Sequence, residues 1–556
     1  AWQAGLDVVF QSSYGQQRPY LDAVERGLVL PAIIDAAVAR VLRVKLQLGL
    51  FEHPHVNPDE AAAANGSVEH RMRARDAARE SIVLLKNDSG SLPLSKTLRS
   101  IAVVGLDASE ARLGGYSGPG VQNVSILDGI RHELTAGTVE YAPGPGRTIH
   151  DFVSVPADAM KPGLTGEYFD NIHLAGLPRL TRTDAQIDFR WTLNSPGRGI
   201  PFDWYSARWT GSIGAPSSGV RRIGVEGNDG YRLYLDDVLA IDDWKKQSFG
   251  RHVVDVAWTP GSAHRVRLEY FESTGNARLK LIWDAGVIDD SEQRIDDAVA
   301  MTKRSDAAVV VAGIEEGEFR DRALLGLPGR QEDLIRRVAE TGKPTIVVLV
   351  GGSAITMSPW IDRVGAVIDA WYPGEQGGNA VADVLFGDAD PAGRLPVTFP
   401  MSEGQLPLSY DHKPTGRGDD YVDLTGMPEF PFGFGLSYTN FEYSDLRIEP
   451  AAIDSAGTAT VRCSVKNIGA RPGDEVAQLY IRDVLASVAR PVMQLEGFQR
   501  VALAPGESKS VDFTLGPEQL HMRGTDNTWV VEPGVFRIMV GASSKDVRLR
   551  GELVVR

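Results

Sequence analysis

The stretch that decides the fold reads Ala307-Ala-Val-Val-Val-Ala-Gly-Ile-Glu-Glu-Gly-Glu-Phe-Arg-Asp-Arg322. Its apolar, β-branched first half predicts a buried strand, and a helical pattern begins near Glu332. A strand that leads into a charged loop and then a helix is how an α/β sheet presents polar side chains at its carboxyl edge. Crowded carboxylates raise one another's pKa and arginines lower it, so this loop is a candidate source of a general acid. A solvated acidic loop is the alternative that these residues alone leave open.

Four further apolar runs have the same texture, at residues 81–87, 101–105, 345–351 and 365–370. Their lack of alternation predicts strands that are buried on both faces of a parallel sheet. Residues 163–286 and 446–556 differ, because polar and apolar side chains alternate there and turn residues are frequent. This period of two predicts two β-sandwiches, of which the first interrupts the α/β domain.

The composition argues against several classes of protein. The chain has 556 residues, too many for one core, so several domains are expected. The formal net charge of -15 argues against nucleic acid and anionic membranes as partners, and no apolar run reaches the length of a membrane span. Cys463 is the single cysteine, and the histidines show no zinc spacing. Phosphate-binding glycine loops and calcium loops are also missing from the sequence, so we expect no cofactor and no metal.

Several motifs together resemble those of glycoside hydrolase family 3. Gly317-Glu318-x-x-Asp321-Arg322, followed by Leu327-Pro328-Gly329-x-Gln331, is similar to the family's acid/base loop. The other matching motifs are Trp371-Tyr-Pro-Gly-Glu-Gln-Gly-Gly-Asn-Ala380, Pro391-Ala-Gly-Arg-Leu-Pro-Val-Thr-Phe-Pro400 and Phe430-Pro-Phe-Gly-Phe-Gly-Leu-Ser-Tyr-Thr439. The interrupting region resembles the protective-antigen-like (PA-14) module found in some members, on stretches that include Gly163-Leu-Thr-Gly-Glu-Tyr-Phe169 and Asn228-Asp-Gly-Tyr-Arg-Leu-Tyr-Leu235.

The resemblance implies a multidomain fold, α/β plus all-β. Family members normally begin with a (β/α)8 barrel, and the opening residues of this chain resemble only the end of that barrel. The last sandwich resembles the family's fibronectin type III-like domain. The implied segments are residues 1–60 (end of the barrel and linker), 61–162 (α/β sandwich domain, first part), 163–286 (inserted protective-antigen-like module), 287–420 (α/β sandwich domain, second part, with the acid/base loop), 421–445 (linker) and 446–556 (fibronectin type III-like domain).

The resemblance also implies an activity and the residues behind it. The expected enzyme is an exo-acting retaining β-glycosidase, first of all a β-glucosidase that releases terminal non-reducing β-D-glucose. Glu318 is expected to be the general acid/base, since the family places this glutamate three residues before the aspartate of its Asp-Arg pair. Asp321 and Arg322 are expected to pair and fix the loop, although Phe319-Arg320 departs from the residues common in the family. The family's nucleophile lies in a Ser-Asp-Trp-like motif, which does not occur in this chain.

Further contacts and other functions stay open. Tyr116 and Ser117 in a glycine-rich loop, and Trp204 and Tyr205 in the interrupting region, are candidate substrate contacts, with a plain turn and sandwich core as the alternatives. β-Xylosidase or another exo-glycosidase is the alternative within the family, because its sugar choice is set largely by the barrel. A carbohydrate-binding assembly without activity is the non-enzymatic alternative. The expected partners are a β-linked oligosaccharide or glucoside and the missing barrel segment; a homo-oligomer stays open, and a periplasmic or secreted location is favoured over the cytoplasm.

Overall fold

The computed structural model describes residues 2–8, 18–115, 117–148, 151–192, 194–215, 218–275, 277–317, 321–415 and 420–556. The chain divides into two compact units, Ala1–Arg73 and Ala74–Arg556. Among the described residues, no helix is both long enough and apolar enough to cross a membrane.

The amino-terminal unit is helical. Its elements are η1 (Trp2–Ala4), α1 (Arg18–Glu25), α2 (Pro31–Gln47) and α3 (Pro58–Ala64). α2 begins at a proline, which has no N–H to leave unsatisfied at a helix start, and α3 begins after Asn57, whose side chain accepts the N–H of Asp59. Among the described residues of this unit only Ala37 is buried, while Val38, Leu42 and Leu46 are exposed. An apolar helix face left this open lacks the packing that normally stabilises a helix.

The core of the second unit is a six-stranded sheet. Its strands are β1 (Val83–Asn87), β2 (Ser100–Val104), β3 (Thr138–Ala142), β15 (Ala307–Gly313), β16 (Thr345–Val350) and β17 (Ala366–Asp369), in the order β1-β17-β16-β15-β2-β3. β1 is antiparallel to β17, and the other neighbours are parallel. The apolar runs in the sequence therefore form the sheet that they predict, because parallel strands covered on both sides need apolar residues at every position.

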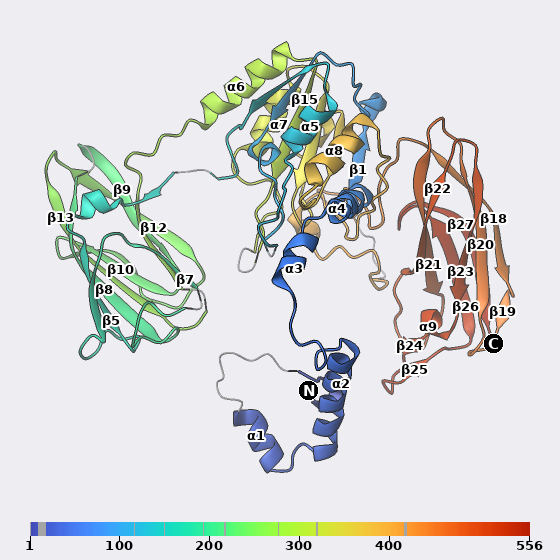
Figure 1. The fold of residues 1–556 in the computed structure, drawn as a ribbon, viewed down its shortest axis with the longest axis horizontal. Coiled ribbons are helices and arrows are strands. Elements are labelled where there is room, and N and C mark those ends of the chain that lie inside the picture. Colours follow the sequence, from blue (N-terminus) through green and yellow to red (C-terminus); the bar gives the residue numbers. More distant parts are fainter. Residues whose placement is uncertain are drawn as a thin grey trace. The chain divides into compact units, whose positions relative to one another are not determined.

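Helices cover both faces of this sheet (Figure 1). α4 (Val68–Ser81), α5 (Ile126–Glu133) and α8 (Gly377–Phe386) pack against alternate strand residues such as Val103, Val309 and Val348. α6 (Ser291–Arg304) and α7 (Gln331–Ala339) pack against the opposite set, such as Val104 and Val310. The short helical turns of this part are η2 (Asp88–Gly90), η3 (Leu106–Ala108), η5 (Ile361–Arg363) and η6 (Glu403–Gln405).

The strand order places a topological switch point between β2 and β15. The chain leaves β2 for β3 on one side, whereas β16 and β17 follow β15 on the other side. At such a point the two crossovers diverge and leave a crevice beyond the carboxyl ends of the strands, where α/β proteins bind their ligands. The backbones are in close contact here, since a Cβ at Gly105 would lie 2.0 Å from the carbonyl oxygen of Val311. Only glycine fits that position, which also has a φ of 112°.

A second all-β region, called the inserted sandwich here, lies between β3 and α6. Its strands are β4 (Val153–Ser154), β5 (Leu164–Phe169), β6 (Leu180–Asp184), β7 (Asp188–Thr192), β8 (Tyr205–Gly214), β9 (Gly219–Gly227), β10 (Gly230–Leu235), β11 (Val238–Asp243), β12 (Gly250–Trp258), β13 (Ala263–Glu272) and β14 (Ala277–Trp283), with η4 (Ala157–Met160). One sheet has the order β11-β10-β13-β8-β5-β6, and the other has β12-β9-β14-β4 with β7 also on β14. Their inward aromatic rings, among them Tyr168, Trp209 and Tyr270, share one core.

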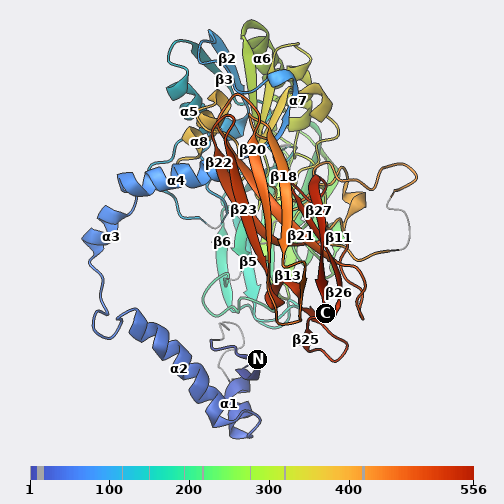
Figure 2. The same ribbon diagram turned by 90° about the vertical axis from the view of Figure 1, so that its right-hand side faces the viewer.

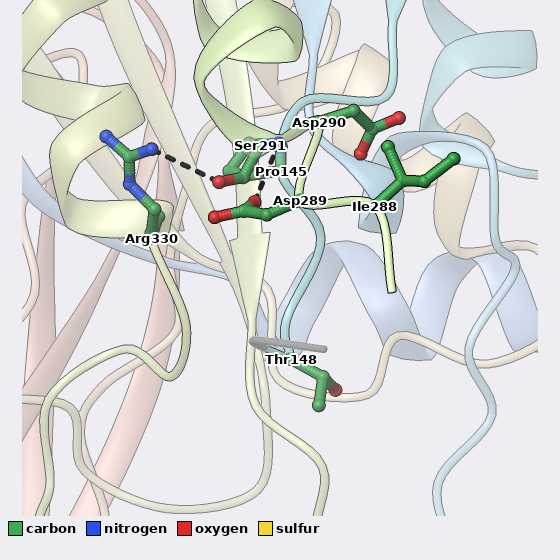
Figure 3. Close-up of a pocket in the computed structure, with 7 residues that line it drawn as sticks. All are labelled: Pro145, Thr148, Ile288, Asp289, Asp290, Ser291 and Arg330. Carbon is green, nitrogen blue, oxygen red and sulfur yellow. Dashed lines mark hydrogen bonds between the residues drawn. The ribbon is translucent and has the colours of Figure 1, made fainter. Parts of the chain in front are cut away.

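The two connections to the inserted sandwich run side by side (Figure 3). Pro145 and Thr148 of the first connection and Ile288 to Ser291 of the second line one small cavity of about 30 Å³. Arg330, just before α7, donates to the hydroxyl of Ser291 at 3.1 Å, which fixes the second connection where α6 begins. The sheet can therefore continue after the insertion with little disturbance, because the insertion leaves and returns at one place.

The last region is a second sandwich, called the terminal sandwich, whose strands β18, β20 and β23 are labelled in Figure 2. Its elements are β18 (Phe441–Glu449), β19 (Ala452–Ile453), β20 (Ala459–Asn467), β21 (Gly473–Asp483), β22 (Gln494–Leu503), β23 (Ser508–Leu515), α9 (Pro517–Leu520), β24 (Met522–Arg523), β25 (Trp529–Val530), β26 (Gly534–Gly541) and β27 (Val547–Val555). Sheets β18-β20-β23 and β19-β27-β26-β21-β22 enclose its core, and β24 pairs with β25. A buried ion pair, Arg394 to Glu475 at 3.0 Å, joins it to the α/β domain.

Candidate active site at the carboxyl edge of the sheet

The acidic loop, residues 314–330, begins where β15 ends at the switch point. Glu315 is exposed, and its carboxylate lies 3.5 Å from the guanidinium of Arg147. Glu316 is more enclosed, with 24% of its side chain exposed. Glu318, the predicted acid/base, lies outside the described residues together with Phe319 and Arg320, and so does Tyr116.

Glu316 ties the acidic loop to the loop that follows β16. Its carboxylate accepts the backbone N–H of Gly352 at 2.5 Å and the hydroxyl of Ser353. The guanidinium of Arg322 lies 3.9 Å from the same carboxylate. Both oxygens of Glu316 thus accept hydrogen bonds from the loop after β16, and they hold the two loops together.

Arg322 has partners other than the one expected from the sequence. Its guanidinium donates to the hydroxyl of Ser353 at 2.9 Å and to the carbonyl oxygens of Ala354 at 3.2 Å and Gly326 at 3.4 Å. Among the described residues, no ion pair joins Arg322 to Asp321, so the predicted pairing is wrong. The physical reason is that Arg322 is mostly enclosed and satisfies backbone carbonyls from β16's loop, whereas Asp321 is exposed.

These side chains border a pocket of about 240 Å³. It is lined by Glu316, Gly317, Asp321, Arg322, Leu325 and Ser353. The two ends of the segment that carries Glu318 therefore both face this pocket. A carboxylate, a guanidinium and a hydroxyl around one opening can hydrogen-bond a polyhydroxylated ligand, which offers both donors and acceptors.

A layer of buried charge lies beneath the acidic loop. Asp107, in η3 after β2, is buried and accepts from Arg112 at 2.9 Å and Arg147 at 2.8 Å. Burial raises the pKa of Asp107, and the guanidiniums of Arg147 and Arg112 oppose that rise. Within the part of the chain that the structure describes, its second carboxylate oxygen has no hydrogen-bond partner. The layer binds the loop after β2 to Arg147 of the first connection and, through Arg147, to Glu315.

Asp369, the last residue of β17, is a second buried acid near the site. Burial raises its pKa to about 8, the N–H of Trp371 opposes that rise, and the negative charge of Glu316 adds to it. The Asp369 carboxyl is therefore largely protonated at neutral pH. It accepts the N–H of Trp371 at 3.1 Å, and Trp371 itself has a φ of 53°, so Asp369 stabilises a tight turn at the end of the sheet.

The glycine-rich loop after β2 packs on the acidic loop. A Cβ at Gly115 would lie 2.8 Å from the carbonyl oxygen of Glu316, and Arg112 lies over the ring of Tyr372 at 5.4 Å. Ser117 is exposed, and its hydroxyl donates to the carbonyl of Gly114 at 2.8 Å. The hydroxyl of Ser117 therefore stabilises its own turn, which is the alternative to the predicted substrate contact.

The two candidate substrate contacts of the inserted sandwich differ in their exposure to solvent. Tyr205 is fully buried in the sandwich core, so its predicted contact with substrate is wrong, because a ring with no exposed face cannot stack on a sugar. Trp204 is 55% exposed and sits in a turn with a φ of 61°. Strand alternation explains the split, since Tyr205 begins β8 and faces inward, while Trp204 precedes the strand.

Three residues of the site are missing from the sequence-based set: Asp107, Asp369 and Ser353. Each stands at or just after the carboxyl end of a buried strand, as Glu316 does. Carboxyl ends of parallel strands meet at one edge. Asp107 and Ser353 just after the runs at 101–105 and 345–351, and Asp369 near the end of the run at 365–370, therefore carried the signal that could have found them.

One cluster of acids has the spacing of a metal site but a different explanation. Oxygens of Glu133, Asp383 and Asp388 lie within 4.8 Å of one another. Arg75 and Arg79 both bind the buried Asp383, and Lys96 binds the other two at 2.8 and 2.6 Å. The charges of the cluster are balanced by these cations, which hold α4 against α8, and we assign it no metal.

Comparisons with known proteins identify the class. The profile of the glycosyl hydrolase family 3 C-terminal domain matches residues 82–438, and that of the fibronectin type III-like domain matches residues 475–544. The chain belongs to glycoside hydrolase family 3. The predicted fold is thereby confirmed at the level of a mixed α/β region followed by an all-β, fibronectin type III-like region.

Three relatives illustrate the match. A β-xylosidase of Formosa agariphila is 31% identical over 94% of this chain and 55% of its own length. A periplasmic β-glucosidase of Salmonella typhimurium is 31% identical over 99% of the chain and 59% of its own length, and thermostable β-glucosidase B of Acetivibrio thermocellus is 39% identical over 98% and 56%. A solved β-glucosidase structure from Erythrobacter marinus has a TM-score of 0.70 and 30% identity, and covers 100% of this chain and 59% of its own. The chain thus spans little more than half the length of these relatives.

Proposed function

We propose that this chain is the acid/base-bearing part of an exo-acting, retaining β-glycosidase, in the first place a β-glucosidase. The observation that carries the proposal is the place of the acidic loop. In a chain of glycoside hydrolase family 3, the residues that flank Glu318 in the sequence, Gly317 and Asp321, lie in the loop after β15 at the switch point of the sheet and line the 240 Å³ pocket. Glu318 is the proposed proton donor to the leaving oxygen and, in the second step, the base that activates water.

The proposed nucleophile is an aspartate of a (β/α)8 barrel segment outside these residues. A retaining mechanism needs its two carboxyl groups roughly 5–5.5 Å apart, so that segment has to bring its aspartate against the acidic loop. The exposed apolar faces of α1 and α2 support the proposal that residues 1–60 belong to the end of that barrel, because such faces are stable when packed. An enzyme made of this chain joined to such a barrel segment is called the completed enzyme below.

The inserted sandwich is proposed to be a protective-antigen-like module that selects for the length of the substrate. Trp204 supports this role, since an exposed indole is a suitable surface for stacking on a sugar ring. The proposed substrate is a β-linked oligosaccharide or glucoside. A periplasmic or secreted location is proposed as well, in line with the name of the Salmonella typhimurium relative.

A β-xylosidase is the second candidate function. Relatives named for that activity, from Formosa agariphila and Xylanibacter ruminicola, are 31% identical to the chain, the same level as the periplasmic β-glucosidase. The kcat/KM values of the completed enzyme on 4-nitrophenyl β-glucoside and β-xyloside decide between the two. The β-glucosidase proposal expects the glucoside to be the better substrate, and a preference for the xyloside contradicts it.

A reconstitution experiment tests the proposed division of labour. Residues 1–556 by themselves should fold and show no hydrolysis of an aryl β-glucoside, because protonation without a nucleophile forms no glycosyl-enzyme. The completed enzyme should hydrolyse it, and a barrel segment whose nucleophile is changed from Asp to Ala should not. Turnover by a verified 556-residue product would contradict the proposal and place the nucleophile within this chain.

A further inference from the structure

We propose that Glu316 is a positioning residue for catalysis, whose carboxylate holds the segment that carries the acid/base Glu318. This inference rests on the proposed function. The basis is the pair of bonds from Glu316 across the sheet edge, to the N–H of Gly352 at 2.5 Å and to the hydroxyl of Ser353. These bonds join the loop after β15 to the loop after β16, and both strands are fully buried.

The carboxylate of Glu316 packs closely against the loop after β16. A Cβ at Gly352 would lie 2.9 Å from a carboxylate oxygen of Glu316, so the glutamate fits against a bare backbone. Ser353 in turn accepts from Arg322 at 2.9 Å. Glu316 and Arg322, which precede and follow residues 317–321 in the sequence, therefore both hydrogen-bond the hydroxyl of Ser353. These bonds tie the two ends of the segment that carries Glu318 to the loop after β16.

A second contact is made between the glycine-rich loop after β2 and residues 316–317. A Cβ at Gly115 would lie 2.8 Å from the carbonyl oxygen of Glu316 and 3.1 Å from Cα of Gly317. The glycine loop after β2 therefore packs directly on Glu316 and Gly317. Glu316 is thus in contact with the loop after β16 through its carboxylate and with the loop after β2 through its backbone.

Glu316 is unsuited to be the proton donor itself. Both of its oxygens accept hydrogen bonds from the loop after β16, and the guanidinium of Arg322 lies 3.9 Å away, so its carboxylate is engaged in holding the loop. Its effect on the reaction is therefore geometric. A displacement of a catalytic group by about 1 Å can cost on the order of 10²-fold in rate.

The test uses the completed enzyme and a series of aryl and alkyl β-glucosides with leaving groups of increasing pKa. Glu316→Ala should lower kcat about 10- to 10²-fold for the poorest leaving groups and only several-fold for dinitrophenyl glucoside, with KM little changed. The basic limb of the pH profile should persist, because Glu318 still titrates. Glu316→Gln should recover part of the loss, since its amide oxygen still accepts the N–H of Gly352. Glu340→Ala, which removes an exposed glutamate paired with Arg363, is the matched control and should leave all rates unchanged.

A measurement on the 556-residue chain separates the inference from the proposed function. Amide hydrogen exchange of residues 321–326 should accelerate in Glu316→Ala and in Ser353→Ala, and not in Glu340→Ala, whatever the chain catalyses. Unchanged exchange, or a loss of rate in Glu316→Ala that is equal for all leaving groups, would overturn the positioning role. If Glu318→Ala lacks a leaving-group dependence while exchange in Glu316→Ala rises, the proposed function fails and the loop contact stands.

Discussion

Glu272 in the inserted sandwich gives a pH dependence that can be worked from the structure. It ends β13, is fully buried, and accepts the hydroxyl of Tyr270 at 2.7 Å, while its other oxygen has no hydrogen-bond partner among the described residues. Burial raises the pKa of Glu272 to about 7; Tyr270 opposes the rise, and the charges of Asp229 and Asp203 add to it.

The size of the effect follows from that rise. A change from 4.5 in the unfolded chain to about 7 in the folded one corresponds to roughly 3 kcal/mol. Because the folded state binds the proton more tightly, the full stability is present below pH 4.5. It falls as the pH rises toward 7 and is constant above that value.

The perturbation is Glu272→Gln, which removes the titration. Six of the ten tryptophans lie between Trp191 and Trp283, so fluorescence during urea unfolding reports mainly on this sandwich. From pH 5 to pH 8 the wild-type chain should lose about 2–3 kcal/mol of stability that the variant does not lose. Glu167→Gln, a partly exposed glutamate on β5, is the control and should keep the wild-type slope. Parallel pH dependences of wild type and Glu272→Gln would refute the reasoning.

Two further predictions concern the joints between domains. Arg394→Met should destabilise the chain by roughly 3–5 kcal/mol in urea unfolding, because it leaves Glu475 buried without its partner, and adding Glu475→Gln should recover most of the loss; a change below about 1 kcal/mol would contradict this. Replacing residues 163–286 with a short Gly/Ser linker should alter the relative rates of the completed enzyme on disaccharide and longer oligosaccharides. The rate on an aryl glucoside should stay within several-fold of the original. An unchanged preference for chain length in a folded variant would contradict the proposed role in chain-length selection.

The sheet could be predicted because burial on both faces leaves a direct record in the sequence. Runs such as 101–105 and 345–351 are almost entirely apolar, and they form β2 and β16 within one residue of either bound. The two sandwich regions were equally legible from their alternation. These features depend on local residues and a single period, so no knowledge of distant contacts was needed.

The errors lie where distant contacts decide. Asp321 and Arg322 are adjacent in the chain, but Arg322 donates its hydrogen bonds to Ser353 and Ala354 in the loop after β16. Tyr205 and Trp204 looked alike in sequence, and only the register of β8 separates core from surface. Asp107 and Asp369 join the site because β2 and β17 run in the same direction within one sheet. The apolar runs mark where each strand ends, but they do not specify which strands share a sheet edge.

The most direct test of the account is Glu318→Ala in the completed enzyme. General acid catalysis is worth about 10²–10⁴-fold, so hydrolysis of glucosides with poor leaving groups should fall by that factor, and dinitrophenyl glucoside should suffer far less. The basic limb of the pH profile should disappear, and added azide should partly restore turnover by replacing water at the glycosyl-enzyme. Azide rescue in Glu315→Ala or Glu316→Ala, with none in Glu318→Ala, would contradict the assignment.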